Sequence, residues 1–203
     1  MMILYSKPAC PLSQQCRFML YEKNIDFEIR DIDHEHFPQA LSWLAPNDLA
    51  PVLVDRGVTL CEPKVINEYI DERYPHPQLI PVDPAERACV RLFLLNFERE
   101  FFVHFAVLEK RETKNNAALQ DLARTHLRAR LISLVPLLRM NMYILGNQFS
   151  ILDVALAPLL WRLEHYDIKM TKNEAPLLKY AERIFTRPAY IDAMTSFERV
   201  MRK

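Results

Sequence analysis

The fold is decided by the stretch from Leu60 to Pro84, which has the sequence L-C-E-P-K-V-I-N-E-Y-I-D-E-R-Y-P-H-P-Q-L-I-P-V-D-P. Glu62 and Pro63 predict the start of a helix, because a proline at the first helical position gives up no hydrogen bond. Pro75 predicts the end of that helix, since its ring disfavours helical geometry at the preceding residue. Three further prolines predict a stiff connector beyond it: Pro77, Pro81 and Pro84.

The helix expected between these prolines has two faces in its sequence. Its apolar residues recur at helical spacing and predict the buried face: Val65, Ile66, Tyr69 and Ile70. Its acidic residues predict the face in contact with water: Glu68, Asp71 and Glu72.

Upstream of this stretch, strand and helix patterns alternate. Short apolar runs predict strands at residues 3–6, 27–30, 51–55 and 58–60, and a tight turn at Arg56 and Gly57 joins the last two. Helical patterns are expected at residues 11–23, 37–44 and 63–74. The resulting order, β-α-β-α-β-β-α, predicts a thioredoxin-like domain over residues 1–78.

Downstream, only helical patterns remain. They predict helices at residues 84–110, 116–142, 151–166, 175–187 and 188–201, with a kink in the second at Pro136. The fold class expected is therefore α/β plus all-α. A thioredoxin-like N-terminal domain is followed by an all-helical C-terminal domain over residues 84–203.

The strongest local signal in the helical part is F-S-I-L-D-V at residues 149–154. Ser150 is expected to cap a helix, and the Asp153 side chain can return a bond to the Ser150 backbone. Phe149 and Val154 stand at the two positions of a hydrophobic staple. The helix that follows is apolar nearly all round, so we expect it to be the buried centre of its domain.

Composition excludes several classes of protein. The chain has 26 basic and 26 acidic residues, and this zero net charge argues against broad nucleic-acid binding. Its two glycines rule out a glycine-rich phosphate loop, and its four cysteines are too few for a disulfide scaffold and lack zinc-site spacing. No leader sequence and no long apolar run occur, so we expect a cytoplasmic protein that does not span a membrane. The balanced charge also leads us to expect no direct sequence-specific nucleic-acid binding.

The combination of a thioredoxin-like domain, a proline-rich link and a helical domain resembles the cytosolic glutathione S-transferase fold over the whole chain. Leu49-Ala50-Pro51-Val52 is similar to that family's cis-proline turn. Glu62 lies where the family has an acidic residue before a serine, and F-S-x-x-D at residues 149–153 looks like its capping box. The resemblance implies a glutathione site, here vestigial, at Cys10, Ala50, Pro51, Glu62 and Pro63.

Two longer stretches resemble the RNA-polymerase-associated bacterial branch of this fold: E-Y-I-D-E-R-Y-P-H-P-Q-L-I-P-V at residues 68–82 and F-S-I-L-D-V-A-L-A-P-L-L-W-R-L at residues 149–163. The resemblance implies a homodimer without transferase activity, and we expect no cofactor and no metal. It also implies contact with RNA polymerase holoenzyme and its primary sigma factor through Pro75, His76 and Pro77. We therefore expect a transcription regulator that acts by protein contact.

Cys10 is the candidate nucleophile of the alternative function, a glutathione-dependent thiol transferase or reductase. It follows the first expected strand and directly precedes a helix, in the sequence C-P-L-S. A helix N-terminus favours the thiolate form of a cysteine, which is the form that attacks substrates. Ser13 stands where a dithiol motif would have a second cysteine, so this loop offers no dithiol cycle. A half-buried loop residue without reactivity is the second interpretation of Cys10.

The glutathione site departs from the family at Pro63. Glutathione-binding relatives have a serine there, whose hydroxyl and backbone N–H hold the γ-glutamyl carboxylate at a helix N-terminus. Proline offers neither group, and each hydrogen bond lost to a charged group costs about 1.5–3 kcal/mol. Ala50 and Pro51, where the family binds the cysteinyl backbone of glutathione, are expected to be only a structural turn.

His76 lies between two prolines, which restrict the backbone and are expected to hold the imidazole outward. A rigid exposed side chain loses little entropy on docking, and this suits a partner-binding surface. A hydrophilic linker is the alternative interpretation of this segment. A structural dimer module with another partner is a third possibility for the function.

The other histidines show no metal-binding pattern. His34 and His36 would share a face of an extended segment, but a solvated loop is the favoured interpretation. His104 is expected to pack in a core or an interface, whereas His126 and His165 stand alone in the sequence.

A local basic face is expected on the helix at residues 116–142. Three arginines form it: Arg124, Arg128 and Arg130. We favour a solvated face, and contact with the polymerase is the alternative.

Overall fold

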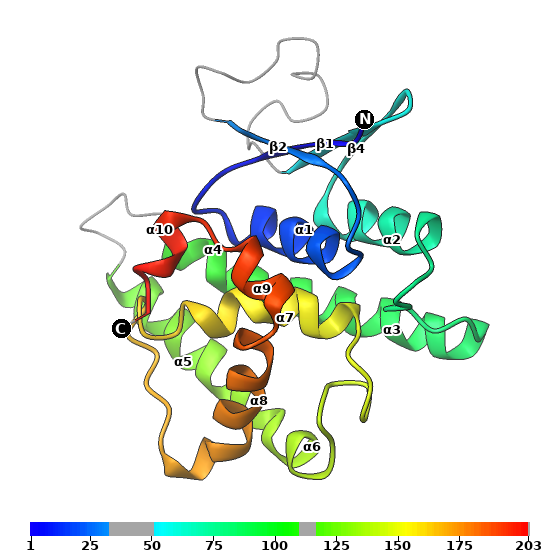
Figure 1. The fold of residues 1–203 in the computed structure, drawn as a ribbon. Helices are drawn as coiled ribbons and strands as arrows, with labels where there is room; N and C mark the ends of the chain where they lie inside the picture. The colour runs from blue at the N-terminus through cyan, green and yellow to red at the C-terminus, as the bar shows by residue number, and fades with distance from the viewer. Residues whose placement is uncertain (33–50, 110–116, 203) are drawn as a thin grey trace. The chain divides into compact units, whose positions relative to one another are not determined.

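The computed structural model describes residues 1–32, 51–109 and 117–202, and Figure 1 shows its ribbon. Contacts divide the chain into two compact units. The first contains Met1–Ile80 together with Arg187–Met201, and the second contains Pro81–Thr186 together with Arg202. The helix expected at residues 37–44 and the pair His34 and His36 lie outside the described residues.

The first unit is built on a mixed sheet whose four described strands have the order β2-β1-β3-β4. The strands are β1 (Ile3–Ser6), β2 (Glu28–Asp31), β3 (Val52–Asp55) and β4 (Val58–Cys61). β1 is parallel to β2 and antiparallel to β3, and β3 is antiparallel to β4. Arg56 and Gly57 close the last hairpin with positive φ angles of 46° and 85°, as a tight turn requires. The expected thioredoxin-like fold is confirmed.

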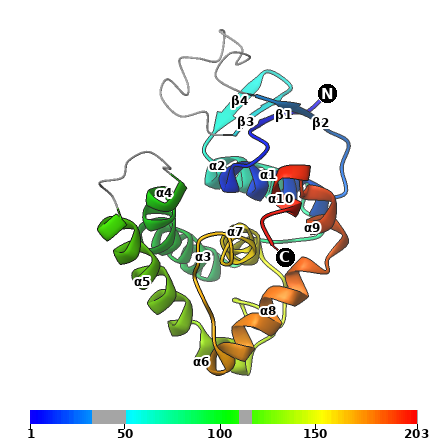
Figure 2. The ribbon, with the colours of Figure 1, turned by 90° about the vertical axis from the view of Figure 1, so that its left-hand side faces the viewer.

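Helices α1 (Pro11–Glu22) and α2 (Pro63–Arg73) cover the same face of this sheet, as Figures 1 and 2 show. The faces of α2 differ in part from the expectation. Ile66 and Ile70 are fully buried, but Val65 is 48% exposed and Asp71 only 4% exposed. The expectation was wrong for Val65 and Asp71, because the buried stripe runs through Pro63, Ile66, Asn67, Ile70 and Asp71.

The last segment of the first unit packs on α1. In α9 (Pro188–Ala193), Tyr190 lies edge-on to Phe18 with ring centroids 5.0 Å apart. The single helix expected at residues 188–201 was wrong, since α10 (Ser196–Arg199) is separate. Thr195 interrupts the helix because it caps α10, and Glu198 accepts the Thr195 backbone N–H at 3.0 Å.

Arg17 of α1 fixes α10 through a buried ion pair. Its Nη2 donates to both carboxylate oxygens of Glu198, at 2.7 and 2.8 Å. Its Nε donates to the carbonyl of Ala193 at 2.8 Å, and its Nη1 donates to Ser6 Oγ at 2.5 Å. The C-terminal segment is therefore part of the first unit's core.

The described part of the second unit is helical. It contains α3 (Pro84–Phe97), a π-helical stretch (Glu98–Phe102), α4 (Val103–Glu109), α5 (Ala117–Ser133), α6 (Val135–Met140), α7 (Ile151–Trp161), a 3-10 turn (Lys172–Glu174) and α8 (Ala175–Phe185). The helix expected at 116–142 is broken before α6, whose first turn contains Pro136. The helix expected at 151–166 ends earlier, at Trp161.

Helix α7 is the centre of the second unit, as the sequence predicts. Every residue from Ile151 to Leu160 is buried. Figure 2 looks nearly along α7 and shows α3 and α8 on opposite sides of it. No helix in the described ranges is long and apolar enough to cross a membrane.

Candidate functional site

Cys10 is half-buried at the N-cap position of α1. Its carbonyl accepts the N–H of Gln14 at 3.0 Å, which starts the helix, and its thiol makes no capping hydrogen bond. Ser13 Oγ accepts the N–H of Lys7 at 3.1 Å. The serine that replaces a second cysteine therefore stabilises the loop in front of the thiol.

Cys16 lies six residues further along the chain, within α1, and is buried. Burial raises the pKa of its thiol far above the ordinary value. The electrostatic influence of Cys10 and of Glu62 raises the pKa of Cys16 further, and Arg17 opposes this shift. Cys10 and Glu62 thus lie within electrostatic range of the same buried thiol, although they are far apart in the sequence.

Glu62 and Pro63 form the turn where the family holds the charged end of glutathione. Glu62 is exposed and has a φ of 70°, a left-handed conformation that is costly for a residue with a side chain. Pro63 is the first residue of α2 and is buried. The first helical residue of α2 therefore has no N–H to offer a ligand.

Pro51 is buried directly before β3. Ala50 lies outside the described residues, so the cis geometry expected for the Ala50–Pro51 bond stays a prediction. The cis bond that the structure does describe joins His76 to Pro77.

Pro75, His76 and Pro77 are all exposed, and we call them the Pro-His-Pro segment. The segment follows the last turn of α2, where Tyr74 donates its N–H to the carbonyl of Ile70 at 2.9 Å. It is followed by Leu79 and Ile80, which are 4% and 3% exposed. An exposed segment is therefore held between two anchored ends.

The anchor is a buried ion pair between Lys23 and Asp71, whose side chains are 0% and 4% exposed. Lys23 Nζ donates to Asp71 Oδ1 and to the carbonyl of Pro77, both at 2.5 Å. The Asp71 carboxylate also accepts the N–H of Leu79 at 3.0 Å and of Ile80 at 3.1 Å. One lysine and one aspartate thus fix the backbone on the C-terminal side of His76.

A second cluster fixes the other side of the Pro-His-Pro segment. The Arg73 guanidinium lies 5.4 Å from the Tyr74 ring centroid, and Arg73 Nε lies 3.0 Å from Asp55 Oδ2. The Tyr69 hydroxyl donates to the same Asp55 oxygen at 2.9 Å. This cluster ties the end of α2 to β3.

Neither Lys23 nor Asp71 is among the site residues that the sequence predicts. The sequence predicts Asp71 on the solvent face, because three acidic residues recur there. A usable signal is its position eight and nine residues before Leu79 and Ile80, since a carboxylate near a helix end can accept backbone N–H groups of the following turn. Lys23, far upstream, gave no such signal.

The capping box at the start of α7 is formed. Ser150 donates its backbone N–H to Asp153 Oδ2 at 2.8 Å, and Ser150 Oγ accepts the N–H of Leu152 at 3.3 Å. Asp153 Oδ1 also accepts the N–H of Ile144 at 3.1 Å and the hydroxyl of Tyr180 at 2.7 Å. Burial raises the pKa of Asp153, and these hydrogen bonds oppose that shift. This site is structural, since its members bind one another.

The three arginines of the expected basic face are engaged within the second unit. Arg124 Nε donates to the carbonyl of Tyr166 at 2.9 Å, and Arg128 Nε donates to the carbonyl of Lys169 at 3.0 Å. Arg130 pairs with Glu100 at 2.6 Å. Arg124 and Arg128 therefore hold the segment after α7 against α5.

His104 and His126 stack with ring centroids 3.9 Å apart, and His126 Nε2 lies 3.2 Å from Glu100 Oε2. His126 stands alone in the sequence, and α4 and α5 bring it onto His104 in the fold. Burial and the neighbouring His126 lower the pKa of His104. Among the described residues, no group of three or more His, Cys, Asp or Glu is arranged to hold a metal ion.

Comparison with known proteins shows the family to which the fold belongs. Residues 4–78 match the glutathione S-transferase N-terminal domain, and residues 94–188 match the glutathione S-transferase C-terminal domain. A crystal structure of a glutathione transferase from Methylococcus capsulatus is similar with a TM-score of 0.84 and 25% identity, covering 99% of this chain and 98% of that one.

The chain is also similar to curated bacterial proteins of this fold. The stringent starvation protein A homolog of Coxiella burnetii is 35% identical over 203 residues, which is 100% of this chain and 95% of that protein. The homolog of Haemophilus influenzae is 32% identical over 195 residues, which is 95% of this chain and 90% of that protein. The chain therefore belongs to the glutathione S-transferase superfamily and, within it, to the stringent starvation protein A family.

Proposed function

We propose that this protein is a transcription regulator that binds RNA polymerase holoenzyme, including its primary sigma factor, by direct protein contact. It works as a homodimer and has no transferase activity. The observation that supports this proposal is the Pro-His-Pro segment, which is exposed but anchored by the buried pair of Lys23 and Asp71.

This segment has the physical properties of a docking surface. Its three side chains are exposed, so they are available to a partner. Its backbone is bound by Lys23 on one side, and its prolines restrict the free conformations. Because little entropy remains to be lost, most of the contact energy would appear as affinity.

Pro63 supports the absence of transferase activity. Glutathione would need a donor pair at the N-terminus of α2, and Pro63 supplies neither a hydroxyl nor an N–H there. The turn at Glu62 is strained, but without these two donors it offers no hydrogen bond to the γ-glutamyl carboxylate.

The homodimer is supported by an apolar stripe on α3. Leu92 is 59% exposed and Phe93 38% exposed, and the exposed Cys89 lies on the same face at helical spacing. Contiguous exposed apolar side chains mark interaction surfaces. Sedimentation of Leu92→Lys should show a dissociation constant at least tenfold weaker, whereas the exposed Met140→Lys should leave the dimer unchanged.

The proposal is tested by asking whether the immobilised protein retains purified RNA polymerase holoenzyme. We expect retention of the core subunits with the sigma factor, and loss of retention when Pro75, His76 and Pro77 are replaced by alanine. His165→Ala is a matched control, since His165 is also an exposed histidine. Retention of no polymerase subunit by the parent protein would refute the proposal.

The second candidate function is a thiol transferase or reductase that uses Cys10. The half-buried thiol at the N-terminus of α1, free of any capping bond, is the observation in its favour. An assay of glutathione-dependent disulfide reduction separates the two functions. Activity that disappears in Cys10→Ser and persists in Cys89→Ser would establish the enzyme, whereas polymerase binding by Cys10→Ser supports the regulator.

A further inference from the structure

A cavity of about 420 Å³ lies within the second unit, between the end of α7, the segment that follows it, and α8. Its size is that of small-molecule sites, which are mostly apolar with a few polar groups. Its walls are largely apolar and aromatic, with six main contributors: Leu160, Trp161, Leu163, Ile168, Leu178 and Phe185. None of the candidate residues discussed above lines it.

One wall of the cavity is an aromatic pair that already holds a cation. The Trp161 and Phe185 rings meet edge to face, with centroids 4.9 Å apart. The Arg202 guanidinium lies 5.4 Å from the Trp161 centroid and 4.8 Å from the Phe185 centroid, and it forms an ion pair with Glu182. Aromatic faces beside a carboxylate are the chemistry that binds organic cations.

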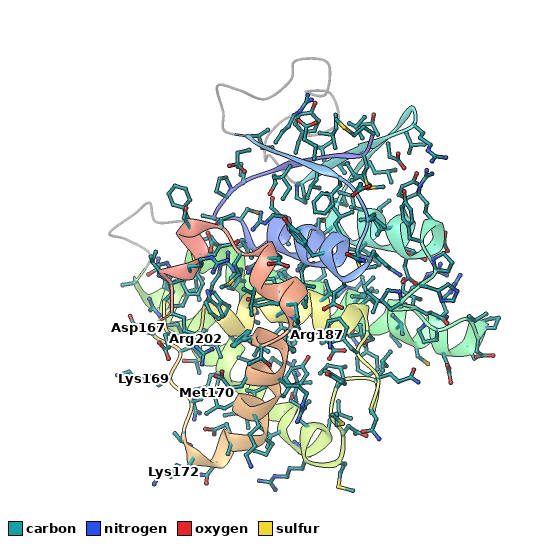
Figure 3. All side chains as sticks on the ribbon, in the orientation of Figure 1. Asp167, Lys169, Met170, Lys172, Arg187 and Arg202 are labelled. Atoms are coloured by element: carbon teal, nitrogen blue, oxygen red, sulfur yellow. The ribbon has the colours of Figure 1, made fainter. Side chains whose placement is uncertain are left out.

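The rim of the cavity carries an excess of negative charge. Three acidic residues line it, Glu164, Asp167 and Glu182, against two basic ones, Lys169 and Arg202. Arg202 and Glu182 neutralise each other. Asp167 is exposed, and its carboxylate has no ion-pair partner in the described ranges. Figure 3 labels Asp167, Met170 and Arg202 beside the segment that leads from α7 to α8.

The arginines of α5 make this cavity a preformed one. Arg124 holds the carbonyl of Tyr166, and Arg128 holds the carbonyl of Lys169. The wall between these two residues contains Asp167 and Ile168. Because its backbone is fixed at both ends, a ligand would not have to order it.

We infer that this cavity binds a small apolar amine, whose hydrocarbon body packs against Trp161 and Leu178 and whose ammonium group faces Asp167. The apolar walls supply most of the binding free energy, and the acidic residues of the rim favour a positively charged ligand. The inference does not depend on contact with RNA polymerase, so each can fail without the other.

The test uses three probes with similar aromatic bodies and different charges: 2-phenylethylamine, 2-phenylethanol and 3-phenylpropionate. The chain has two tryptophans, so Trp43→Phe leaves Trp161 as the only tryptophan and its fluorescence reports binding at the cavity wall. At low salt we expect the amine to bind about threefold to fivefold more tightly than the alcohol, the factor that an exposed ion pair supplies. The carboxylate should bind most weakly, and 0.5 M salt should reduce the differences.

Asp167→Asn is the decisive variant. Asp167 has a φ of 57°, and asparagine tolerates this conformation as well as aspartate does, so the fold should be kept. The variant should lose the preference for the amine while still binding the alcohol. Asp192→Asn, an exposed substitution of the same kind on α9, should change neither affinity.

Leu178→Arg tests the cavity itself. Leu178 is 40% exposed, so the fold should tolerate the change, and a long cation in the cavity mouth should abolish binding of both amine and alcohol. Circular dichroism checks that each variant folds. If Leu178→Arg does not fold, the result for Asp167→Asn decides the question alone. The inference is overturned if no probe changes the fluorescence of Trp161, if the carboxylate binds most tightly, or if Asp167→Asn keeps the preference for the amine.

Discussion

At the scale of single residues, we expect substitution of Lys23 or Asp71 to lower the free energy of unfolding most. Their side chains are 0% and 4% exposed and make four hydrogen bonds, one of which joins them to each other. A buried ion pair contributes little net stability by itself, but removing one member leaves an uncompensated charge. These two residues therefore link the fold of the first unit to the shape of its exposed Pro-His-Pro segment.

Asp71→Ala should lower the free energy of unfolding by about 3–5 kcal/mol, because Lys23 then remains buried without its partner. Urea denaturation measures this loss. Glu72→Ala, at the next and exposed position, should change the free energy by less than about 0.5 kcal/mol. Equal effects of the two substitutions would show that the ion pair is not formed in solution.

His104 gives a pH dependence of stability with a defined sign. Burial and the charges of His126 and Arg130 lower its pKa in the folded protein from the ordinary 6.5, and Glu100 opposes them. Below pH 6.5 the unfolded chain therefore binds a proton at this position more readily than the folded chain. The contribution of His104 is fully present above pH 6.5 and is lost as the pH falls through the lowered value.

Chemical denaturation at pH 7.5 and pH 5.5 tests this sign. The parent protein should lose more stability between these two values than His104→Gln does. His165→Gln, a histidine away from the stacked pair, should behave as the parent does. A larger loss in His104→Gln than in the parent would reverse the sign and contradict the stacked arrangement.

At the scale of elements, α7 depends on its cap. Ser150→Ala should lower the free energy of unfolding by about 0.5–2 kcal/mol, because it removes a capping hydrogen bond from a helix whose residues Ile151 to Leu160 are all buried. Thermal unfolding measures the loss as a lower melting temperature. Ser133→Ala, an exposed serine at the end of α5, is the matched control. An unchanged melting curve for Ser150→Ala would show that the cap contributes nothing.

Elements that local chemistry determines could be predicted from the sequence. Pro63 and Pro11 start their helices, Ser150 and Asp153 start α7, and Pro136 interrupts the helix around it. Each of these signals acts between residues a few positions apart.

Features that depend on distant residues could not be predicted. Asp71 is buried because Lys23, 48 positions away, meets it in space. His126 stacks on His104 only because α5 folds back along α4. The break between α9 and α10 has a local signal, the box formed by Thr195 and Glu198, which apolar periodicity concealed.

At the scale of the whole molecule, we propose that the chain has the glutathione S-transferase fold without the transferase activity. Titration calorimetry with glutathione should show no binding in the micromolar range, because Pro63 removes two donors to a carboxylate at about 1.5–3 kcal/mol each. Pro63→Ser restores both groups and should strengthen any residual binding. Micromolar binding by the parent protein would favour the thiol enzyme.

We propose that the Pro-His-Pro segment is a binding surface and not a linker. Replacing Pro75, His76 and Pro77 by alanine keeps the backbone carbonyl that Lys23 binds, so the fold should survive. The His76 side chain is exposed, so its replacement alone should change the free energy of unfolding by less than about 0.5 kcal/mol, whereas loss of the two prolines should lower it because the unfolded chain gains freedom. Sedimentation and thermal unfolding check that the dimer and the fold are unchanged.

The most direct measurement is the dissociation constant of this triple variant and of the parent protein for RNA polymerase holoenzyme, by biolayer interferometry. Truncating a central preorganised contact costs about 2 kcal/mol or more, which weakens binding by about thirtyfold. We expect at least this loss of affinity in the triple variant. The control His165→Ala should bind as tightly as the parent protein does. A triple variant that folds, dimerises and binds the holoenzyme within about twofold of the parent, a difference of about 0.4 kcal/mol, would contradict the account.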